Sequence, residues 1–278
     1  MSKSERRLPS FQRPPVAEVI LSVQFDPIPG LMVPQIGLLW SEFRQRFPKV
    51  QQHAPITPVV ERLGATSDGP SLQLVPPKVT PRVWFVDQNE RELVQVQPDR
   101  FIRNWKKVDD SDEYPRYDNH VRPRFLSDLN QFLAFLSREK LEEFKPNQCE
   151  VTYINHLVSG EGWENHADLG QIFTGWKGFQ TKIDLPELED VRVATRHLLK
   201  DQHGEFIGRL HIAVEPGVRK SDDKQAFAMT LTARGKPPAA TVEGVMSFMD
   251  FGREVIVRGF KATTSKGLHD IWEEVTDE

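Results

Sequence analysis

Hydrophobic residues recur along Thr241–Thr264 with the period of one long helix. At about 100° per residue they form an apolar stripe, which normally faces a sheet or another helix. A second apolar group shares the opposite side with Gly244, Gly252 and Gly259. Glycine costs a helix roughly 1 kcal/mol relative to alanine, so three on one side predict that another backbone passes close by. We expect a core helix held from two directions. The stripe comprises Val242, Val245, Met246, Met249, Ile256, Val257, Phe260 and Thr263, and the opposite group comprises Phe248, Phe251 and Val255.

Runs rich in β-branched residues predict strands, and apolar residues at helical spacing predict further helices. The run 16–25 ends at the turn signal Asp-Pro-Ile-Pro-Gly, and a helix after it stops at Pro48. A Pro-rich link follows, in which short strands are expected at 59–63 and 72–75. The other expected strands are 82–86, 92–97, 100–106, 148–158, 191–200, 205–214 and 225–233, and the other expected helices are 122–144, a short one at 167–174, and 241–264.

A meander followed by a long helix thus occurs twice along the chain. We therefore predict an α+β protein of two antiparallel β-meander units, each followed by a long amphipathic helix and packed as sheet-on-helix layers. The predicted organisation is a flexible tail at 1–13, an N-terminal α+β unit at 14–160 and a C-terminal α+β unit at 161–278 closed by the helix 241–264. Whether the two units form one domain or two stays open.

The strand 100–106 is the first candidate for a binding site. Alternation places Phe101, Arg103 and Trp105 on one face and Arg100 and Asn104 on the other. Guanidinium and indole groups together favour planar or anionic ligands. An exposed edge strand that carries charges against aggregation explains the same pattern. Nucleic acid is disfavoured because four acidic residues follow at once, at 109, 110, 112 and 113.

Arg253 is the sharpest single anomaly, since it lies in the middle of the apolar stripe of the long helix. A buried guanidinium without a partner costs several kcal/mol, so Arg253 meets a carboxylate, extends to the surface or lines an anion-binding cavity. Our hypothesis is that it reaches the same cleft as Arg103. The alternative is an arginine that extends past the helix to a surface acid. The candidate ligand-binding residues are Arg100, Arg103, Trp105, Arg116, His156 and Arg253.

Complete catalytic and metal motifs are absent from the sequence. The stretch 64–69 has the glycine spacing of a phosphate loop, but Pro70 and Ser71 stand where the motif needs Lys and Ser or Thr. His197 and His211 are expected on opposite faces of a hairpin, so they do not predict a metal site. We predict no catalytic residue, no metal and no cofactor. The alternative is a hydrolase that uses His156 or His166, the latter in the run Asn165-His-Ala-Asp168.

Composition bounds the location and the partners. The net charge is −4, and the single cysteine, Cys149, excludes an intrachain disulfide and fits a reducing compartment. Cys149 is expected to be a small buried hydrophobe. No stretch approaches the roughly 20 apolar residues of a membrane span, and the basic start lacks a signal-peptide core. We therefore expect a cytoplasmic protein that does not bind membranes.

Two stretches resemble a known family. The run 14–25 (PPVAEVILSVQF) and the runs 93–107 (LVQVQPDRFIRNWKK) and 114–117 (YPRY) resemble a sporadically distributed bacterial family of uncharacterised proteins. The resemblance implies a bacterial accessory gene, of a distribution typical of mobile islands that include defence and toxin–antitoxin loci. It implies no activity, cofactor or catalytic residue. We expect an accessory interaction protein that binds a protein partner, a second copy of itself or a small anionic ligand; the alternative is a hydrolase-type enzyme without a recognisable motif.

Overall fold

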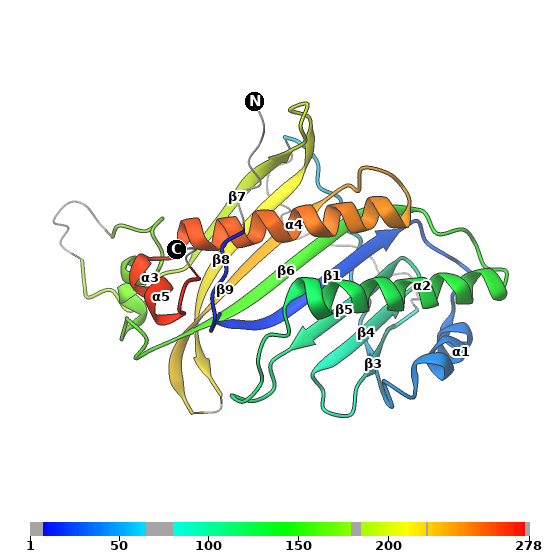
Figure 1. Cartoon of the computed structure of the whole chain (residues 1–278), viewed down its shortest axis with the longest axis horizontal. Helices are drawn as coiled ribbons and strands as arrows, with labels where there is room; N and C mark the ends of the chain where they lie inside the picture. The colour runs from blue at the N-terminus through cyan, green and yellow to red at the C-terminus, as the bar shows by residue number, and fades with distance from the viewer. Residues whose placement is uncertain (1–7, 65–79, 179–184, 221, 276–278) are drawn as a thin grey trace.

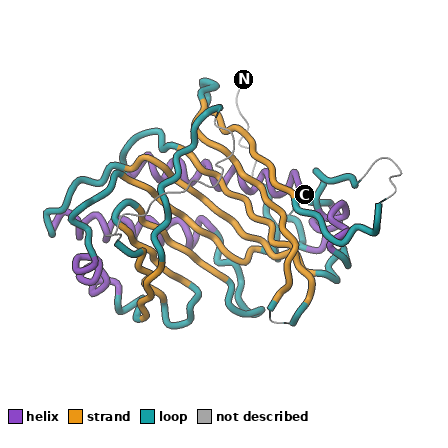
Figure 2. Tube along the Cα trace, turned by 180° about the vertical axis from the view of Figure 1, so that it is seen from behind, coloured by secondary structure: helices purple, strands orange, loops and turns teal. Residues whose placement is uncertain are grey.

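The computed structural model describes residues 8–64, 80–178, 185–220 and 222–275. In these residues nine strands form one antiparallel sheet in the order β2-β3-β4-β5-β1-β6-β9-β8-β7. The long helices α2 and α4 cover one face of the sheet (Figure 1), and Figure 2 shows the sheet from its other face. The strands are β1 (Val16–Phe25), β2 (Lys49–His53), β3 (Arg82–Val86), β4 (Glu92–Gln97), β5 (Arg100–Lys106), β6 (Pro146–Val158), β7 (Val193–Lys200), β8 (Phe206–Arg219) and β9 (Lys224–Gly235), and the helices are α1 (Val33–Phe43), α2 (Arg122–Arg138), α3 (Leu169–Ile172), α4 (Val242–Thr263) and α5 (Lys266–Ile271).

The sheet is built outwards from its two central strands. β1 pairs with β5 on one side and with β6 on the other. Because side chains alternate along a strand, Val19, Leu21 and Val23 are buried beneath the helices while Ser22 and Gln24 point to the opposite face. The result is an α+β fold whose sheet runs without a break from the N-terminal half into the C-terminal half.

Several elements lie where the hydrophobic pattern predicts them. The strands at 16–25, 82–86, 92–97 and 100–106 have the expected bounds. The long helix spans 242–263, with Thr241 as its N-cap accepting a hydrogen bond from the Gly244 amide. An N-cap side chain satisfies one of the amides that the first helical turn leaves without a partner, so the expected start is confirmed.

Other predictions differ from the structure. β2 was missed because it is an edge strand with exposed, mostly polar residues that show no alternation. Residues 59–63 form no strand; they belong to an irregular segment, 54–64, that crosses the face of the sheet away from the helices (Figure 2). The expected strand at 72–75 lies outside the described residues. α2 ends at Arg138 instead of 144, and α5 was not foreseen.

The glycines of α4 face the chain's own sheet. A Cβ on Gly252 would lie 3.0 Å from Val151 Cγ2 on β6, and one on Gly259 would lie 3.1 Å from Leu210 Cδ2 on β8. At these two positions the close neighbours are side chains of the sheet. Of these three glycines only Gly244 has backbone as its nearest neighbour, because an added Cβ there would meet the carbonyl oxygen of Ala239. The glycine side therefore cannot be the seam of a homodimer, an option that the sequence leaves open.

The hydrophobic side chains of α4 are covered as well. Met249 and Ile256 are buried, as is Phe248, while Phe251 and Val255 are half-buried against the same core. Both apolar groups predicted for α4 are therefore covered. On the side of α2, Asp250 accepts hydrogen bonds from Tyr117 Oη at 2.9 Å and Arg122 Nε at 2.7 Å, which tie the two long helices together.

The N-terminal segment is packed from residue 8 onwards, whereas a flexible tail was expected over 1–13. Phe11 is buried and forms an isolated β-bridge with Glu274 near the other end of the chain. Its ring packs edge-on against Phe260 of α4 and against Trp272. Residues 1–7 lie outside the described part. Among the described helices, none has the length and apolar character needed to span a membrane.

The glycine packing generates a stability prediction. Gly252→Leu forces a side chain between α4 and Val151, so we expect the free energy of unfolding to fall by about 1–3 kcal/mol, the usual cost of overpacking. The control is Gly37→Leu on α1, where an added Cβ meets nothing within 4 Å; there we expect no loss and a gain of up to about 1 kcal/mol. Urea unfolding followed by tryptophan fluorescence measures both, and equal stabilities would contradict the packing.

Candidate ligand-binding pocket

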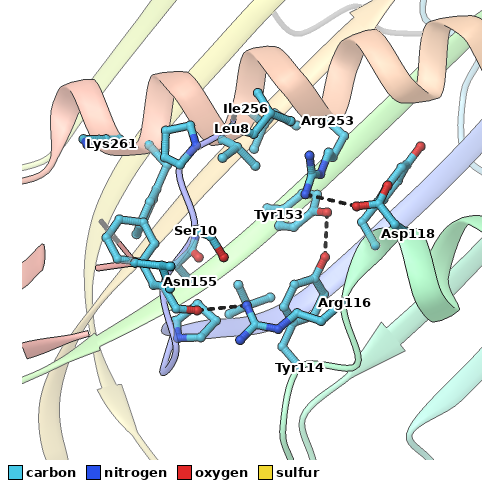
Figure 3. Close-up of a pocket in the computed structure, with 18 of the residues that line it drawn as sticks. Leu8, Ser10, Tyr114, Arg116, Asp118, Tyr153, Asn155, Arg253, Ile256 and Lys261 are labelled. Atoms are coloured by element: carbon cyan, nitrogen blue, oxygen red, sulfur yellow. Dashed lines mark hydrogen bonds and ion pairs between the residues drawn. The ribbon is translucent and has the colours of Figure 1, made fainter. Parts of the chain in front are cut away.

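A pocket of about 750 Å³ lies between the N-terminal segment, α4, β6 and the loop that leads into α2 (Figure 3). Its walls combine aromatic and aliphatic side chains with a few charged ones, which is the usual composition of a small-molecule site. The lining residues are Leu8, Pro9, Ser10, Phe11, Pro14, Val16, Tyr114, Arg116, Tyr117, Asp118, Asn119, Tyr153, Asn155, Arg253, Ile256, Val257, Phe260, Lys261, Glu274 and Val275.

All three tyrosines of the chain line this pocket. The hydroxyls of Tyr114 and Tyr153 share a hydrogen bond of 2.9 Å, and Tyr117 Oη donates to Asp250. Burial raises the pKa of Tyr114 to about 12. Burial also raises the pKa of Tyr153, and burial together with the nearby Asp250 carboxylate raises that of Tyr117. The phenols are therefore neutral at physiological pH and act as hydrogen-bonding groups.

Arg253 reaches the pocket from the middle of α4. Its guanidinium lies over the ring of Tyr117, 5.4 Å from the ring centroid. Nη2 is 3.6 Å from Asp118 Oδ2, but the Asp118 side chain is 72% exposed. Water screens a pair of this kind, so it contributes little. Arg253 Nε is buried and has no hydrogen-bond partner within the described structure, which leaves a directional donor and a weakly neutralised charge at the pocket wall.

Arg116 holds the segment that covers the pocket. It donates hydrogen bonds to the carbonyl oxygens of Phe11 at 2.9 Å and Gln12 at 3.0 Å. Its backbone has φ +68°, in the left-handed region that is uncommon for residues other than glycine. Carbonyls satisfy its donors without neutralising its charge. The lining residues include three cationic side chains, those of Arg116, Arg253 and Lys261, and two carboxylates, those of Asp118 and Glu274. Cationic groups therefore outnumber carboxylates in the pocket wall.

The structure brings Arg116 and Arg253 together but places the other candidates elsewhere. Arg103 is buried below α2, with Nη2 2.7 Å from Glu92 Oε2 and Nε 3.1 Å from Asp128 Oδ2. It lines a separate, small cavity, so the hypothesis that Arg253 and Arg103 share a cleft is wrong. Trp105 stands beside the pocket, with its ring centroid 5.7 Å from that of Tyr114.

Arg100 and His156 lie on the opposite face of the sheet from Arg103. Arg100 is buried and donates to Gln24 Oε1 at 2.6 Å. His156 is exposed, and its pKa is lowered by partial burial and by the cations Arg219 and Lys107. His156, one of the two histidines of the hydrolase alternative, therefore lies apart from Arg103 and Trp105.

The remaining catalytic candidates have structural roles. Asn165 and Asp168 form a capping box at the short turn His166–Asp168, and His166 Nε2 lies 3.1 Å from the Ala226 carbonyl. His197 pairs with Leu210, one position from the pair of His211 with Arg196, so the two histidines face opposite sides as expected. Throughout the described chain, no group of three or more His, Cys, Asp or Glu side chains is placed to hold a metal ion.

One arrangement that resembles a catalytic triad was not foreseen. Thr264 Oγ1 lies 2.8 Å from His269 Nε2, and His269 Nδ1 lies 3.7 Å from Glu274. However, the Thr264 hydroxyl donates its only proton to the Phe260 carbonyl at 2.7 Å, so His269 must be the donor in their contact and cannot act as a base. Thr264 is also buried. The group terminates α4 and joins it to α5.

Sequence reasoning missed most of the pocket walls. Tyr153, Asn155 and the segment 8–11 are far from Arg253 in the sequence, and only the fold brings them together. The clustering of tyrosines at 114 and 117 was the available signal, since it stands within the YPRY run.

Comparison with protein-family models, with curated proteins and with solved structures finds no match for this chain.

The shared burial of the phenols generates a pH prediction. Tyrosine ordinarily titrates near pH 10, so the unfolded chain releases phenolic protons between about pH 10 and 12 that the folded chain keeps. We therefore expect stability to fall as the pH rises through this window. The folded protein should show no tyrosinate absorbance below about pH 11, measured in the near ultraviolet alongside circular dichroism. A phenol that ionises near pH 10 while the dichroism stays native would refute this description of the pocket.

Proposed function

We propose that the protein is a non-catalytic binding protein that holds a small anionic ligand with a planar or apolar body in the pocket beneath its N-terminal segment. The observation that carries this proposal is Arg253, whose buried Nε has no partner and whose nearest carboxylate is exposed. A ligand carboxylate, phosphate or sulfonate would accept from this donor and offset the charge, since charge-assisted hydrogen bonds are the stronger ones.

The other walls fit the remainder of such a ligand. Phe11, Tyr114 and Phe260 provide aromatic surface, and the neutral phenols provide hydrogen bonds without adding negative charge. The pocket size lies within the range of roughly 300–1,000 Å³ that is usual for small-molecule sites. Because no described set of side chains offers a nucleophile with an activating base at this pocket, binding without chemistry is the simpler function.

We further propose that the fold contains one β-meander unit used twice, with β6 in the second unit and not in the first, where the expected boundary after residue 160 places it. What supports this is the strand order: β1 and β6 are adjacent at the centre, β2–β5 extend on one flank and β7–β9 on the other. In each half the last strand returns to pair with the first: β5 pairs with β1, and β9 pairs with β6. A long helix follows the last strand of each half, α2 after β5 and α4 after β9.

The wider biological role remains a proposal that rests on the resemblance of residues 14–25 and 93–117. We propose a cytoplasmic accessory protein of a patchily distributed bacterial family, of the kind encoded in defence or toxin–antitoxin loci. In this role, the protein would bind a protein partner or a small anionic ligand.

The test of the pocket uses anilinonaphthalene sulfonate, a fluorescent aromatic anion, as the probe. We expect Arg253→Met to weaken its binding at least about tenfold, equivalent to 1.4 kcal/mol, because the substitution keeps the apolar stem and removes the guanidinium. The melting temperature should change little, since the partner of Arg253 is an exposed carboxylate.

The matched control is Arg258→Met, which removes a charge from the exposed side of the same helix, where Arg258 pairs with Glu254. Its probe affinity should equal that of the unsubstituted protein. Equal affinities for all three proteins, or a large loss of stability with binding intact in Arg253→Met, would reject the proposed role. Mass spectrometry of small molecules released from the purified protein then identifies the natural ligand.

A further inference from the structure

The face of the sheet away from the helices is polar and is nevertheless buried. Its residues come from six neighbouring strands, β4, β5, β1, β6, β9 and β8. The segment 54–64 runs across these strands (Figure 2). Buried polar residues of this face include Gln24, Gln97, Arg100, Gln148 and Arg209. Burying a polar group costs free energy unless the group is hydrogen-bonded. The hydrogen-bond partners of these side chains therefore indicate what this face binds.

These side chains bind the backbone of the segment 54–64. Gln97 holds Ile56 by two bonds, donating from Nε2 to the carbonyl at 2.9 Å and accepting from the amide at 3.0 Å. Gln24 Oε1 accepts from the Val59 amide at 3.1 Å. Arg209 donates to the carbonyl of Arg62 at 2.5 Å. Main-chain contacts of this kind recognise an extended peptide whatever its side chains, as in other peptide-binding modes.

One side chain of the segment is recognised as well. The Glu61 carboxylate meets Arg209, lies 2.7 Å from His211 Nε2 and lies 3.5 Å from Arg234 Nη1. Burial alone would raise the pKa of Glu61, but hydrogen bonds from His211 and Arg209 lower it to about 2. Three groups on two strands therefore form a carboxylate site that Glu61 occupies.

The segment leaves part of the face unused. Arg100 Nε and Gln148 Nε2 have no hydrogen-bond partner within the described structure. Both side chains are more than nine-tenths buried. They border a small cavity beneath Val59. On the outer side, Val60 and Leu63 are largely exposed. The chain's own segment thus satisfies this groove incompletely.

We propose that this face is a binding groove for an extended acidic peptide of a partner protein, and that the chain's segment 54–64 occupies the groove in its absence. The partner segment carries a carboxylate that binds where the Glu61 carboxylate now binds. The residues before that carboxylate are extended, like the resident segment, in which Pro55 and Pro58 favour an extended backbone. This groove lies on the opposite side of the sheet from the anion pocket, so the proposal does not depend on the function of that pocket.

The test is a competition between the resident segment and a labelled copy of it. The probe is a fluorescent peptide of residues 54–64 with blocked ends, and binding is followed by fluorescence anisotropy. Glu61→Gln weakens the resident segment and leaves Arg209, His211 and Arg234 in place. We expect this variant to bind the peptide at least about tenfold more tightly than the unsubstituted protein does. A peptide with Gln at the Glu61 position should lose most of this affinity.

The control is Glu143→Gln, which removes an exposed carboxylate outside the groove and should bind the peptide as the unsubstituted protein does. A second variant replaces residues 54–63 by a Gly-Ser linker of the same length, which empties the groove without altering its walls. Circular dichroism establishes that each variant is folded. The proposal is overturned if no folded variant binds the peptide more tightly than the unsubstituted protein, or if the Glu and Gln peptides bind equally.

Discussion

The pairing of β1 with β6 at the centre of the sheet is the constraint on which the rest of the molecule depends. It joins the two halves of the chain into one sheet and gives that sheet two chemically different faces. On one face Val19, Leu21 and Val151 form a continuous apolar surface that only long helices can cover. On the other face Ser22, Gln24 and Thr152 leave no surface for a helix to bury. The alternation of a single pair of strands thus decides where the core lies and where polar recognition can occur.

The helix-covered face explains how the pocket beside Arg253 is formed. α4 lies close to the sheet because Gly252 and Gly259 have no side chains that would separate them from β6 and β8. Arg253, next to Gly252 in the helix, therefore lines the pocket beside β6. The N-terminal segment then closes the space between α4 and the sheet, and Arg116 anchors it through two carbonyls. Removing a guanidinium from water costs free energy that an exposed carboxylate such as Asp118 offsets only in part. The pocket and the buried ion pairs of Arg103 beneath α2 are therefore places where this face departs from simple core packing.

The polar face follows a different principle. Glutamine and arginine side chains there bind the main chain of the segment 54–64, and a cluster of Arg209, His211 and Arg234 binds its glutamate. Binding on this face is directional, whereas packing on the helix face depends on shape and burial. Two sites with different chemistry can thus coexist on one sheet without sharing residues.

The sequence alone determined the elements whose residues repeat with a clear period. β1, β3, β4, β5 and α4 follow from runs of strand-forming residues or from the stripe around Met249. Alternation also predicted that Arg103 and Trp105 share one face of their strand. Arg253 was recognisable as an anomaly because it interrupts that stripe. The tertiary structure decided what the anomalies meet: it pairs Arg103 with Asp128, gives Arg253 a pocket with Tyr114 and Tyr153, and lays Glu61 across Arg209. Periodicity records which face of an element is buried, but the identity of the neighbour depends on strand order and loop path, which join residues too far apart in the chain for any local pattern to relate.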